Sequence, residues 1–189
     1  MAGSNEVLLV RHGETDENAL ARFQGRIDTE LNERGREQSR ALAQAVRDEG
    51  LCALYCSPLR RALQTARIVG AAIGLQPILD ERLVEADAGA WSGRLIADIL
   101  AGERAEYARW RAADPTFRFP GGESVAEQSQ RIAAALADVA AGPLPALVVT
   151  HGGTIRAIEG IEPPPDGSVP NCAVIRLRGD RLPAPSARP

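Results

Sequence analysis

The sequence predicts a three-layer α/β/α fold with a mostly parallel central sheet, and two observations support this prediction. Short apolar runs alternate with longer segments of helical periodicity along the chain. The runs at 6–10 and 145–149 are apolar except for Glu6, which is typical of strands that are covered by helices on both faces. Because neither a repeat nor a linker divides the 189 residues, we expect one domain over 1–181 and a flexible, Pro-rich tail over 182–189.

Five strands are expected, each a short run rich in aliphatic or β-branched side chains. They cover residues 6–10, 51–56, 77–79, 145–149 and 173–178. The run at 77–79 is the shortest, and its extension through 82–84 stays open. The sequence over 162–167 contains three consecutive prolines and a glycine, which predicts a loop.

Helical periodicity predicts the segments between the strands. The apolar positions recur at helical spacing between Asn32 and Gly50, and Gly50 is placed to cap that helix at its C-terminus. A second helix is expected to begin with Ser57 as N-cap and Pro58 at its first position. An amphipathic helix is expected over 123–141, and a short one after residues 152–154.

Residues 92–119 form an insertion whose helical pattern is irregular and is interrupted at Asp114-Pro115. It contains four of the seven aromatic residues of the chain, namely Tyr107, Trp110, Phe117 and Phe119. We hypothesise that the insertion is a small lid with an apolar wall for the leaving group of a substrate. The alternative is that these rings pack a helix onto the body of the domain.

Composition excludes several classes of protein. The chain is 44% hydrophobic and 25% charged, as expected of a globular domain with a core. A net charge of −3 makes nucleic acid a poor partner. All 22 basic residues are arginines, which excludes a Walker phosphate loop and lysine Schiff-base chemistry, and two histidines cannot build a multi-histidine metal centre. The three cysteines are expected to be reduced thiols, buried or half-buried.

The sequence also bears on location and assembly. No apolar run approaches the roughly 18–20 residues that a membrane span requires. Residues 1–6 have neither a basic flank nor an apolar signal core, so we expect a cytoplasmic protein without a membrane partner. A monomer and a homodimer are both compatible with the sequence.

Each of the two histidines directly follows an expected buried strand. His12 comes after the strand at 6–10 and Arg11, and His151 comes after the strand at 145–149 and Thr150. Ligands of open α/β sheets bind at the carboxyl ends of the strands, so both imidazoles are expected in the functional crevice. Glycine follows each histidine and permits a tight turn and a close approach of the substrate.

Arginines follow two of the predicted strands, those at 6–10 and 51–56. Arg11 adjoins His12, and Arg60 and Arg61 lie in the first turn of the helix expected after Ser57. A helix N-terminus favours anions, and a guanidinium group matches phosphate oxygens in a bidentate manner. Two imidazoles and several guanidinium groups therefore point to a phosphate dianion as ligand.

An ordered series of motifs resembles the histidine phosphatase superfamily, in its phosphoglycerate mutase-like branch. The motifs run in family order across residues 6–178: Leu9-Val10-Arg11-His12-Gly13-Glu14-Thr15, Arg22-Phe23-Gln24-Gly25, Ser57-Pro58-Leu59-Arg60-Arg61-Ala62, Leu83-Val84-Glu85, Pro120-Gly121-Gly122-Glu123-Ser124 and Val149-Thr150-His151-Gly152-Gly153. Arg-His-Gly alone is weak evidence, whereas the ordered set is specific. The resemblance implies a phosphoglycerate mutase-like fold with one antiparallel edge strand.

The resemblance also implies a role for each matching residue. His12 resembles the nucleophile, Glu85 the general acid and base, and Arg11, Arg61 and His151 the phosphate-clamping groups. Arg60 falls on a variable position. Further contacts to phosphate or substrate are implied for Asn18, Gln24, Gly25 and Gly152.

These residues form a coherent mechanism. A neutral imidazole attacks phosphorus and forms a phosphohistidine, while Arg11, Arg61 and protonated His151 neutralise the charge on the phosphoryl oxygens. Glu85 protonates the departing alkoxide and then activates water. Neither a metal nor another cofactor is required, because the Arg and His cations supply the positive charge.

Three functional interpretations follow. The first is a phosphatase that hydrolyses small phosphomonoesters through a phosphohistidine, and we favour it. The second is a cofactor-dependent phosphoglycerate mutase, whose family members are longer and carry an extra basic segment, whereas residues 92–119 are short and hold only scattered arginines. The third is a non-catalytic phospholigand-binding protein, against which the presence of both His12 and Glu85 argues. The natural substrate is not predicted.

Overall fold

A computed structural model of the chain describes residues 5–158 and 168–178. Five strands form one sheet in the order β3-β2-β4-β1-β5. They are β1 (Glu6–Arg11), β2 (Ala53–Cys56), β3 (Ile78–Leu79), β4 (Ala146–Thr150) and β5 (Val174–Arg178). The first four run parallel, and β5 pairs antiparallel with β1 at the edge. The expected mostly parallel sheet with one antiparallel edge strand is therefore confirmed.

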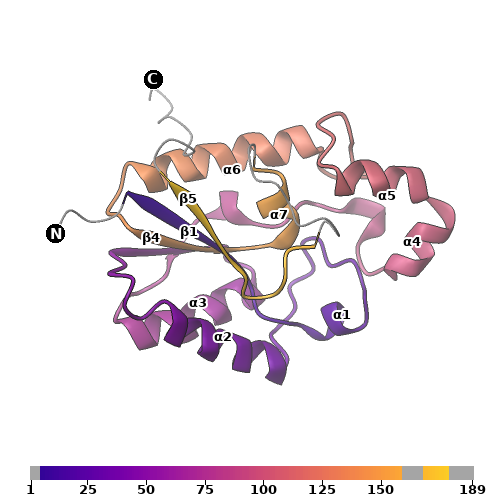
Figure 1. The fold of residues 1–189 in the computed structure, drawn as a ribbon. Coiled ribbons are helices and arrows are strands. Elements are labelled where there is room, and N and C mark those ends of the chain that lie inside the picture. The colour runs from indigo at the N-terminus through magenta and orange to yellow at the C-terminus, as the bar shows by residue number, and fades with distance from the viewer. Residues whose placement is uncertain (1–4, 159–167, 179–189) are drawn as a thin grey trace.

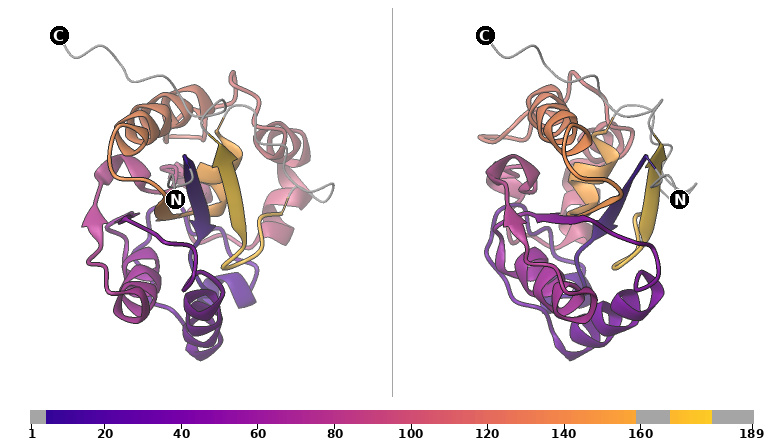
Figure 2. Two further views of the ribbon diagram at one scale, coloured as in Figure 1. Left: turned by 60° about the vertical axis from the view of Figure 1, so that its left-hand side comes forward. Right: turned by 90° about the vertical axis from the view of Figure 1, so that its left-hand side faces the viewer.

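Helices cover both faces of the sheet (Figure 1). On one face lie α2 (Glu33–Ala45) and α3 (Arg60–Ile73), and on the other lies α6 (Val125–Ala140). Smaller elements complete the fold: α1 (Asp16–Ala19), the 3₁₀ turns Glu81–Leu83 and Gly89–Trp91, α4 (Ile96–Gly102), α5 (Arg104–Arg111) and α7 (Gly152–Arg156). The views in Figure 2 show the sheet between the two helical layers. None of the helices in the described ranges is long and apolar enough to cross a membrane.

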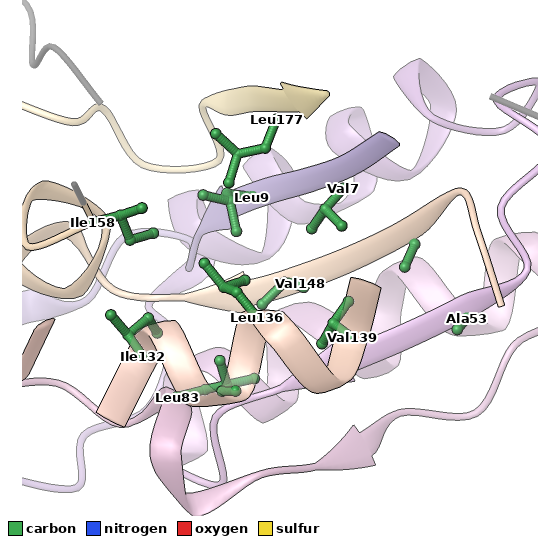
Figure 3. Close-up of a cluster of buried hydrophobic side chains, with 12 residues drawn as sticks. Val7, Leu9, Ala53, Leu83, Ile132, Leu136, Val139, Val148, Ile158 and Leu177 are labelled. Atoms are coloured by element: carbon green, nitrogen blue, oxygen red, sulfur yellow. The ribbon is translucent and has the colours of Figure 1, made fainter. Parts of the chain in front are cut away.

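Each face of the sheet has its own apolar core, because the strands alternate their side chains between the two faces. On the α6 side, Val7, Leu9 and Val148 of the sheet pack against Ile132 and Leu136 (Figure 3). On the opposite side, the intervening strand residues pack against α2 and α3, a cluster that includes Leu8, Val10, Leu42, Leu54, Ala66, Val69 and Val149. The strands are therefore fixed from both sides, and so are the loops that leave their ends.

A third cluster lies outside the sheet. Trp91 and Ile99 are fully buried in it, and the other members are mostly aromatic: Phe23, Phe117, Phe119 and Val125, with Tyr107 and Trp110 partly buried against them. The cluster packs α4 and α5 onto the end of the molecule that the carboxyl ends of the strands face (Figure 1).

The structure corrects three details of the sequence prediction. The helix after Ser57 begins at Arg60, not at Pro58, and its first free N–H is capped by Asp28 Oδ1 at 2.7 Å. The helix that follows Asn32 ends at Ala45, and Gly50, with φ of +64°, closes the turn beyond it. Residues 81–83 form a 3₁₀ turn, so the strand at 78–79 does not extend through 84.

Two further expectations, the loop at 162–167 and the tail at 182–189, lie outside the described residues. The three cysteines are free, as expected. Cys56 is buried and Cys172 is half-buried, but Cys52 is exposed, which the sequence did not predict.

Candidate active site

A cavity of about 160 Å³ opens at the carboxyl ends of β1 and β4. All nine predicted site residues except His151 are among those that line it. The lining includes five arginines, Arg11, Arg22, Arg61, Arg111 and Arg156, and a single acidic residue, Glu85. This excess of positive charge in a concave site suits an anionic ligand.

His12 is almost fully buried, and its two ring nitrogens have different partners. Nδ1 lies 2.6 Å from the carbonyl oxygen of Gly13, which can only accept, so Nδ1 carries the proton. Nε2 accepts a hydrogen bond from Nε of Arg61 at 3.2 Å. Burial lowers the pKa of His12 well below its ordinary value, and the charges of Arg61 and Arg11 lower it further. The ring is therefore neutral at physiological pH, with its lone pair on Nε2.

Arg61 is 1% exposed, and the chain itself fixes its orientation. Its Nη1 and Nη2 donate to the carbonyl oxygens of Ile27 and Gly25 at 2.7 and 2.8 Å, which leaves Nε for His12. Burial lowers the pKa of Arg61 to about 10, so the group stays cationic at neutral pH. Arg60 points away from the cavity and pairs with Glu30 at the surface. Of the two adjacent arginines, the structure thus brings Arg61 to His12.

Arg11 supplies a second cation beside His12. Its Nη1 donates to the carbonyl oxygen of Val169 at 2.5 Å. Its Nε is buried and finds no hydrogen-bond partner among residues 5–158 and 168–178. A buried donor without a partner costs stability, unless a ligand oxygen satisfies it. Nε of Arg11 is therefore available to donate a hydrogen bond to an oxygen atom of an anionic ligand.

His151 lies beside His12, although it is not among the residues that line the cavity. The two ring centroids are 5.2 Å apart, and His151 is fully buried. Its Nε2 lies 2.8 Å from Oγ of Ser57, and its Nδ1 has no partner within the described part of the chain. Burial lowers the pKa of His151 well below its ordinary value, and Arg61 lowers it further. Without a ligand the ring is therefore neutral, and the imidazolium that the sequence predicts for the phosphate-bound state stays a prediction.

Ser57 has a role that the sequence did not predict. It was expected to cap a helix, but its hydroxyl group instead contacts His151 and accepts a hydrogen bond from the N–H of Leu59 at 3.3 Å. The hydroxyl group thus holds the His151 ring, and the helix starts at Arg60, two residues later than expected.

The carboxylate of Glu85 is held by hydrogen bonds from several directions. Oε2 accepts from the N–H of Gly153 at 2.9 Å. Oε1 accepts from the N–H of Ala86 at 2.9 Å and from Nε2 of Gln128 at 3.1 Å, and Oγ1 of Thr154 lies 3.3 Å from it. Glu85 follows a 3₁₀ turn rather than a strand. Its position therefore depends on these hydrogen bonds and not on the sheet.

Sequence reasoning missed Gln128 and Thr154, although each carries a signal. Gln128 is a polar residue on the apolar face of α6, three residues after Val125 and four before Ile132, and it is 1% exposed. A polar side chain at such a position needs a buried partner. Thr154 follows the second glycine of the His151 motif and donates to the carbonyl oxygen of Val84 at 3.0 Å.

The remaining predicted contacts also lie at the cavity. Oδ1 of Asn18 accepts from the N–H of Thr15 at 3.2 Å, and Oε1 of Gln24 accepts from the Thr29 hydroxyl at 2.7 Å. Gly25 has φ of +53°, and a Cβ there would lie 2.8 Å from the Cβ of Ala88. Residue 25 must therefore be glycine. Its carbonyl oxygen accepts a hydrogen bond from Nη2 of Arg61.

The aromatic insertion divides between the two roles considered for it. Tyr107 and Trp110 line the cavity, as a wall for a leaving group requires. Phe117 and Phe119 are instead buried against Trp91, with ring centroids 5.5 and 5.4 Å away, and serve to pack the segment. No group of three or more His, Cys, Asp or Glu side chains arranged to hold a metal ion occurs in the ranges that the structure describes.

The chain is similar to known proteins over most of its length. The model of the histidine phosphatase superfamily (branch 1) matches residues 7–180. The chain is 37% identical to phosphoserine phosphatase 1 of Hydrogenobacter thermophilus over 134 residues, 71% of this chain and 64% of that protein. It is 42% identical over 151 residues to a probable phosphoglycerate mutase GpmB of Enterobacter sp., 78% of this chain and 69% of that one.

Among solved structures, a mycobacterial glucosyl-3-phosphoglycerate phosphatase matches with a TM-score of 0.79 and 32% identity, over 90% of this chain and 88% of that one. The chain spans less than two thirds of the length of the Hydrogenobacter relative.

Proposed function

The chain belongs to the histidine phosphatase superfamily, and on this premise we propose that it hydrolyses small phosphomonoesters through a phosphohistidine formed on His12. The observation that carries the proposal is the hydrogen bond between the buried Arg61 and Nε2 of His12. It joins a nucleophilic lone pair to a guanidinium group that can hold the phosphoryl oxygens during attack on phosphorus.

In the first half of the reaction, Nε2 of His12 forms a bond to phosphorus as the ester P–O bond breaks. The proton on Nδ1, held by the carbonyl oxygen of Gly13, keeps the attacking lone pair on Nε2. The departing oxygen takes a proton from Glu85. Water then attacks phosphorus, the P–N bond breaks, and Glu85 takes the proton of the water, so phosphate leaves and His12 is restored.

Positive charge at phosphorus comes from Arg11, Arg61 and His151. The unpartnered Nε of Arg11 and Nδ1 of His151 are donors that phosphoryl oxygens can satisfy. A phosphate dianion favours the protonated imidazole, so we expect His151 to take up a proton when substrate binds, although it is neutral in the free protein. These cations supply the electrostatic stabilisation that phosphoryl transfer needs.

The size of the cavity limits the substrate. Pockets for drug-sized ligands span roughly 300–1,000 Å³, whereas this cavity holds about 160 Å³. We therefore propose a small phosphorylated metabolite as substrate. The phosphatase names of two of the three relatives above support hydrolysis.

A panel of phosphomonoesters tests the proposal, with wild type compared to His12→Ala and EDTA present throughout. We expect hydrolysis by wild type, with a loss of about 10⁴-fold or more in the variant because the nucleophile is gone. Residual turnover near the wild-type rate in His12→Ala, or a strict requirement for an added metal, would refute the mechanism.

The name of the Enterobacter relative makes a mutase the second candidate. A single turnover of phosphorylated enzyme separates the two. Transfer of the phosphoryl group to water supports a phosphatase, and transfer to added phosphoglycerate supports a mutase.

A further inference from the structure

Arg156 is a buried cation at the cavity that the mechanism above does not use. It ends α7, is 8% exposed, and lines the cavity together with Glu85 and Arg111. Its Nε is buried without a hydrogen-bond partner among the described residues. No carboxylate of those residues forms an ion pair with it. Burial lowers the pKa of Arg156 to about 10, so it stays cationic at neutral pH.

Trp110 fixes the orientation of this guanidinium group. The Cζ atom of Arg156 lies 4.2 Å from the centre of the Trp110 ring. Such stacking is favourable when the cation is desolvated, and because it uses one face of the planar group it does not occupy the donors on the edge. Trp110 lies on α5 and Arg156 on α7, so the pair stands where the aromatic insertion meets the body of the domain.

The pair is distinct from the groups that surround the nucleophile. Arg61 is bound to His12, Gly25 and Ile27. No hydrogen bond joins Arg156 to any of these within the described ranges. When Arg11 and Arg61 hold a phosphoryl group, that group does not neutralise the positive charge of Arg156. Glu85 is the one acidic residue among those that line the cavity.

We propose that Arg156, stacked on Trp110, binds a carboxylate on the leaving-group side of the substrate, so that the chain prefers phosphomonoesters of small hydroxy acids. This inference rests on the proposed phosphatase function. One guanidinium edge matches one carboxylate in a bidentate manner. Because Arg156 lines the same cavity of about 160 Å³ as His12, we expect this carboxylate to lie within a few bonds of the ester oxygen.

The test compares two substrates that share a carbon chain, 3-phosphoglycerate and glycerol 3-phosphate, which differ by a carboxylate in place of a neutral CH₂OH group. We expect wild type to favour 3-phosphoglycerate in kcat/KM. In Arg156→Gln, kcat/KM for 3-phosphoglycerate should fall by about 10–100-fold, chiefly through KM, because a charge-assisted pair is lost. The value for glycerol 3-phosphate should change by less than about threefold, since a neutral group gains little from a cation.

Three further variants separate recognition from a structural role. Arg156→Lys keeps the charge without the planar edge and should recover part of the preference. Trp110→Leu removes the stacking partner from the other helix and should reduce the preference in the same direction. Arg109→Gln removes an arginine that lies on α5 away from the cavity, where it bonds Asp114 and Thr116, and should leave the preference unchanged.

Equal kcat/KM for the two substrates in wild type would overturn the inference, and so would an equal loss for both substrates in Arg156→Gln. Either result leaves the proposed function intact if p-nitrophenyl phosphate is still hydrolysed in a His12-dependent manner. Absence of His12-dependent hydrolysis of all three esters would instead overturn the proposed function, and the inference with it.

Discussion

The two ends of the cavity are built in different ways. At the end that we propose binds phosphate, called the phosphate end below, His12 and His151 follow two adjacent parallel strands, and Arg61 donates a hydrogen bond to His12. At the end that we propose binds the leaving group, called the leaving-group end below, Tyr107, Trp110 and Arg156 are brought together by short helices that an aromatic cluster packs onto the domain. The first end depends on the sheet, and the second depends on side-chain packing outside it.

Because of this difference, we expect one end to determine the rate of the reaction and the other end to determine the preference among substrates. Changes at the phosphate end should lower the rate for every substrate, because phosphorus is common to all of them. Changes at the leaving-group end should alter the order of preference among substrates. Changes in the packing behind that end should affect stability alone. The predictions below test this separation, from the largest expected effect to the smallest.

Glu85→Gln should give the largest effect. It removes the proton donor to the leaving group, and kcat should fall by about 10²–10⁴-fold for alkyl phosphates. In kcat/KM, which covers only the steps up to departure of the leaving group, the loss should be much smaller for p-nitrophenyl phosphate, whose leaving group departs without a proton. Steady-state kinetics on both esters measure this, with the exposed Glu106→Gln as control. An equal loss in kcat/KM on the two esters would contradict a role for Glu85 as general acid.

Gly153→Ala should disturb the same carboxylate from the opposite side. A Cβ at residue 153 would lie 2.5 Å from Oε1 of Glu85, so the carboxylate must move. Because a small misplacement of a catalytic group is costly, we expect a loss of about tenfold or more in kcat. Gly102→Ala is the matched control, since no atom lies within 4 Å of its added methyl group. A fully active Gly153→Ala would show that the position of Glu85 is not critical.

The pH dependence of stability should originate at the phosphate end. The pKa values of His12 and His151 in the folded protein lie below the ordinary value near 6.5. As pH falls below about 6.5, the unfolded chain takes up protons first, so the free energy of unfolding should fall by up to about 1.4 kcal/mol per pH unit for each histidine.

Urea unfolding at pH 7 and at pH 5.5 checks this prediction. These are the only histidines of the chain, so the double variant His12→Gln, His151→Gln should lose less stability over this range than wild type does. Equal losses would show that other groups cause the acid sensitivity.

Phe117→Leu should give the smallest effect on function. Phe117 is 2% exposed and packs against Trp91 and Phe119 without lining the cavity. Exchange for another large apolar side chain should lower the free energy of unfolding by about 1.5 kcal/mol or less. The order of preference among phosphomonoesters should stay as in wild type. A changed order would show that the packing behind the leaving-group end also selects substrates.

Much of the phosphate end could be predicted from the sequence, because the carboxyl ends of parallel strands meet at one edge. Two histidines that each follow a buried strand therefore had to approach one another, and their rings are 5.2 Å apart. The choice of Arg61 over Arg60 came from the resemblance to a family. The predicted start of α3 was wrong, but this does not affect the choice, because Arg61 lines the cavity in a helix that begins at Arg60.

The other features depend on contacts between distant segments. Glu85 is positioned by Gln128 and Thr154, which lie 43 and 69 residues further along the chain, and no local pattern indicates such pairs. The stack of Arg156 on Trp110 likewise depends on how the insertion packs. The charge of His151 in the free protein depends on its burial, which lowers its pKa. This burial cannot be predicted from the residue type alone.

The most direct test of the central claim is to trap the enzyme during turnover and to locate the phosphoryl group by mass spectrometry of its peptides. The account predicts one acid-labile, alkali-stable phosphoryl group on the ring of His12, formed in wild type, accumulating in Glu85→Gln with an activated ester, and absent from His12→Ala. A phosphoryl group on any other residue, or turnover by His12→Ala without a labelled intermediate, would contradict it.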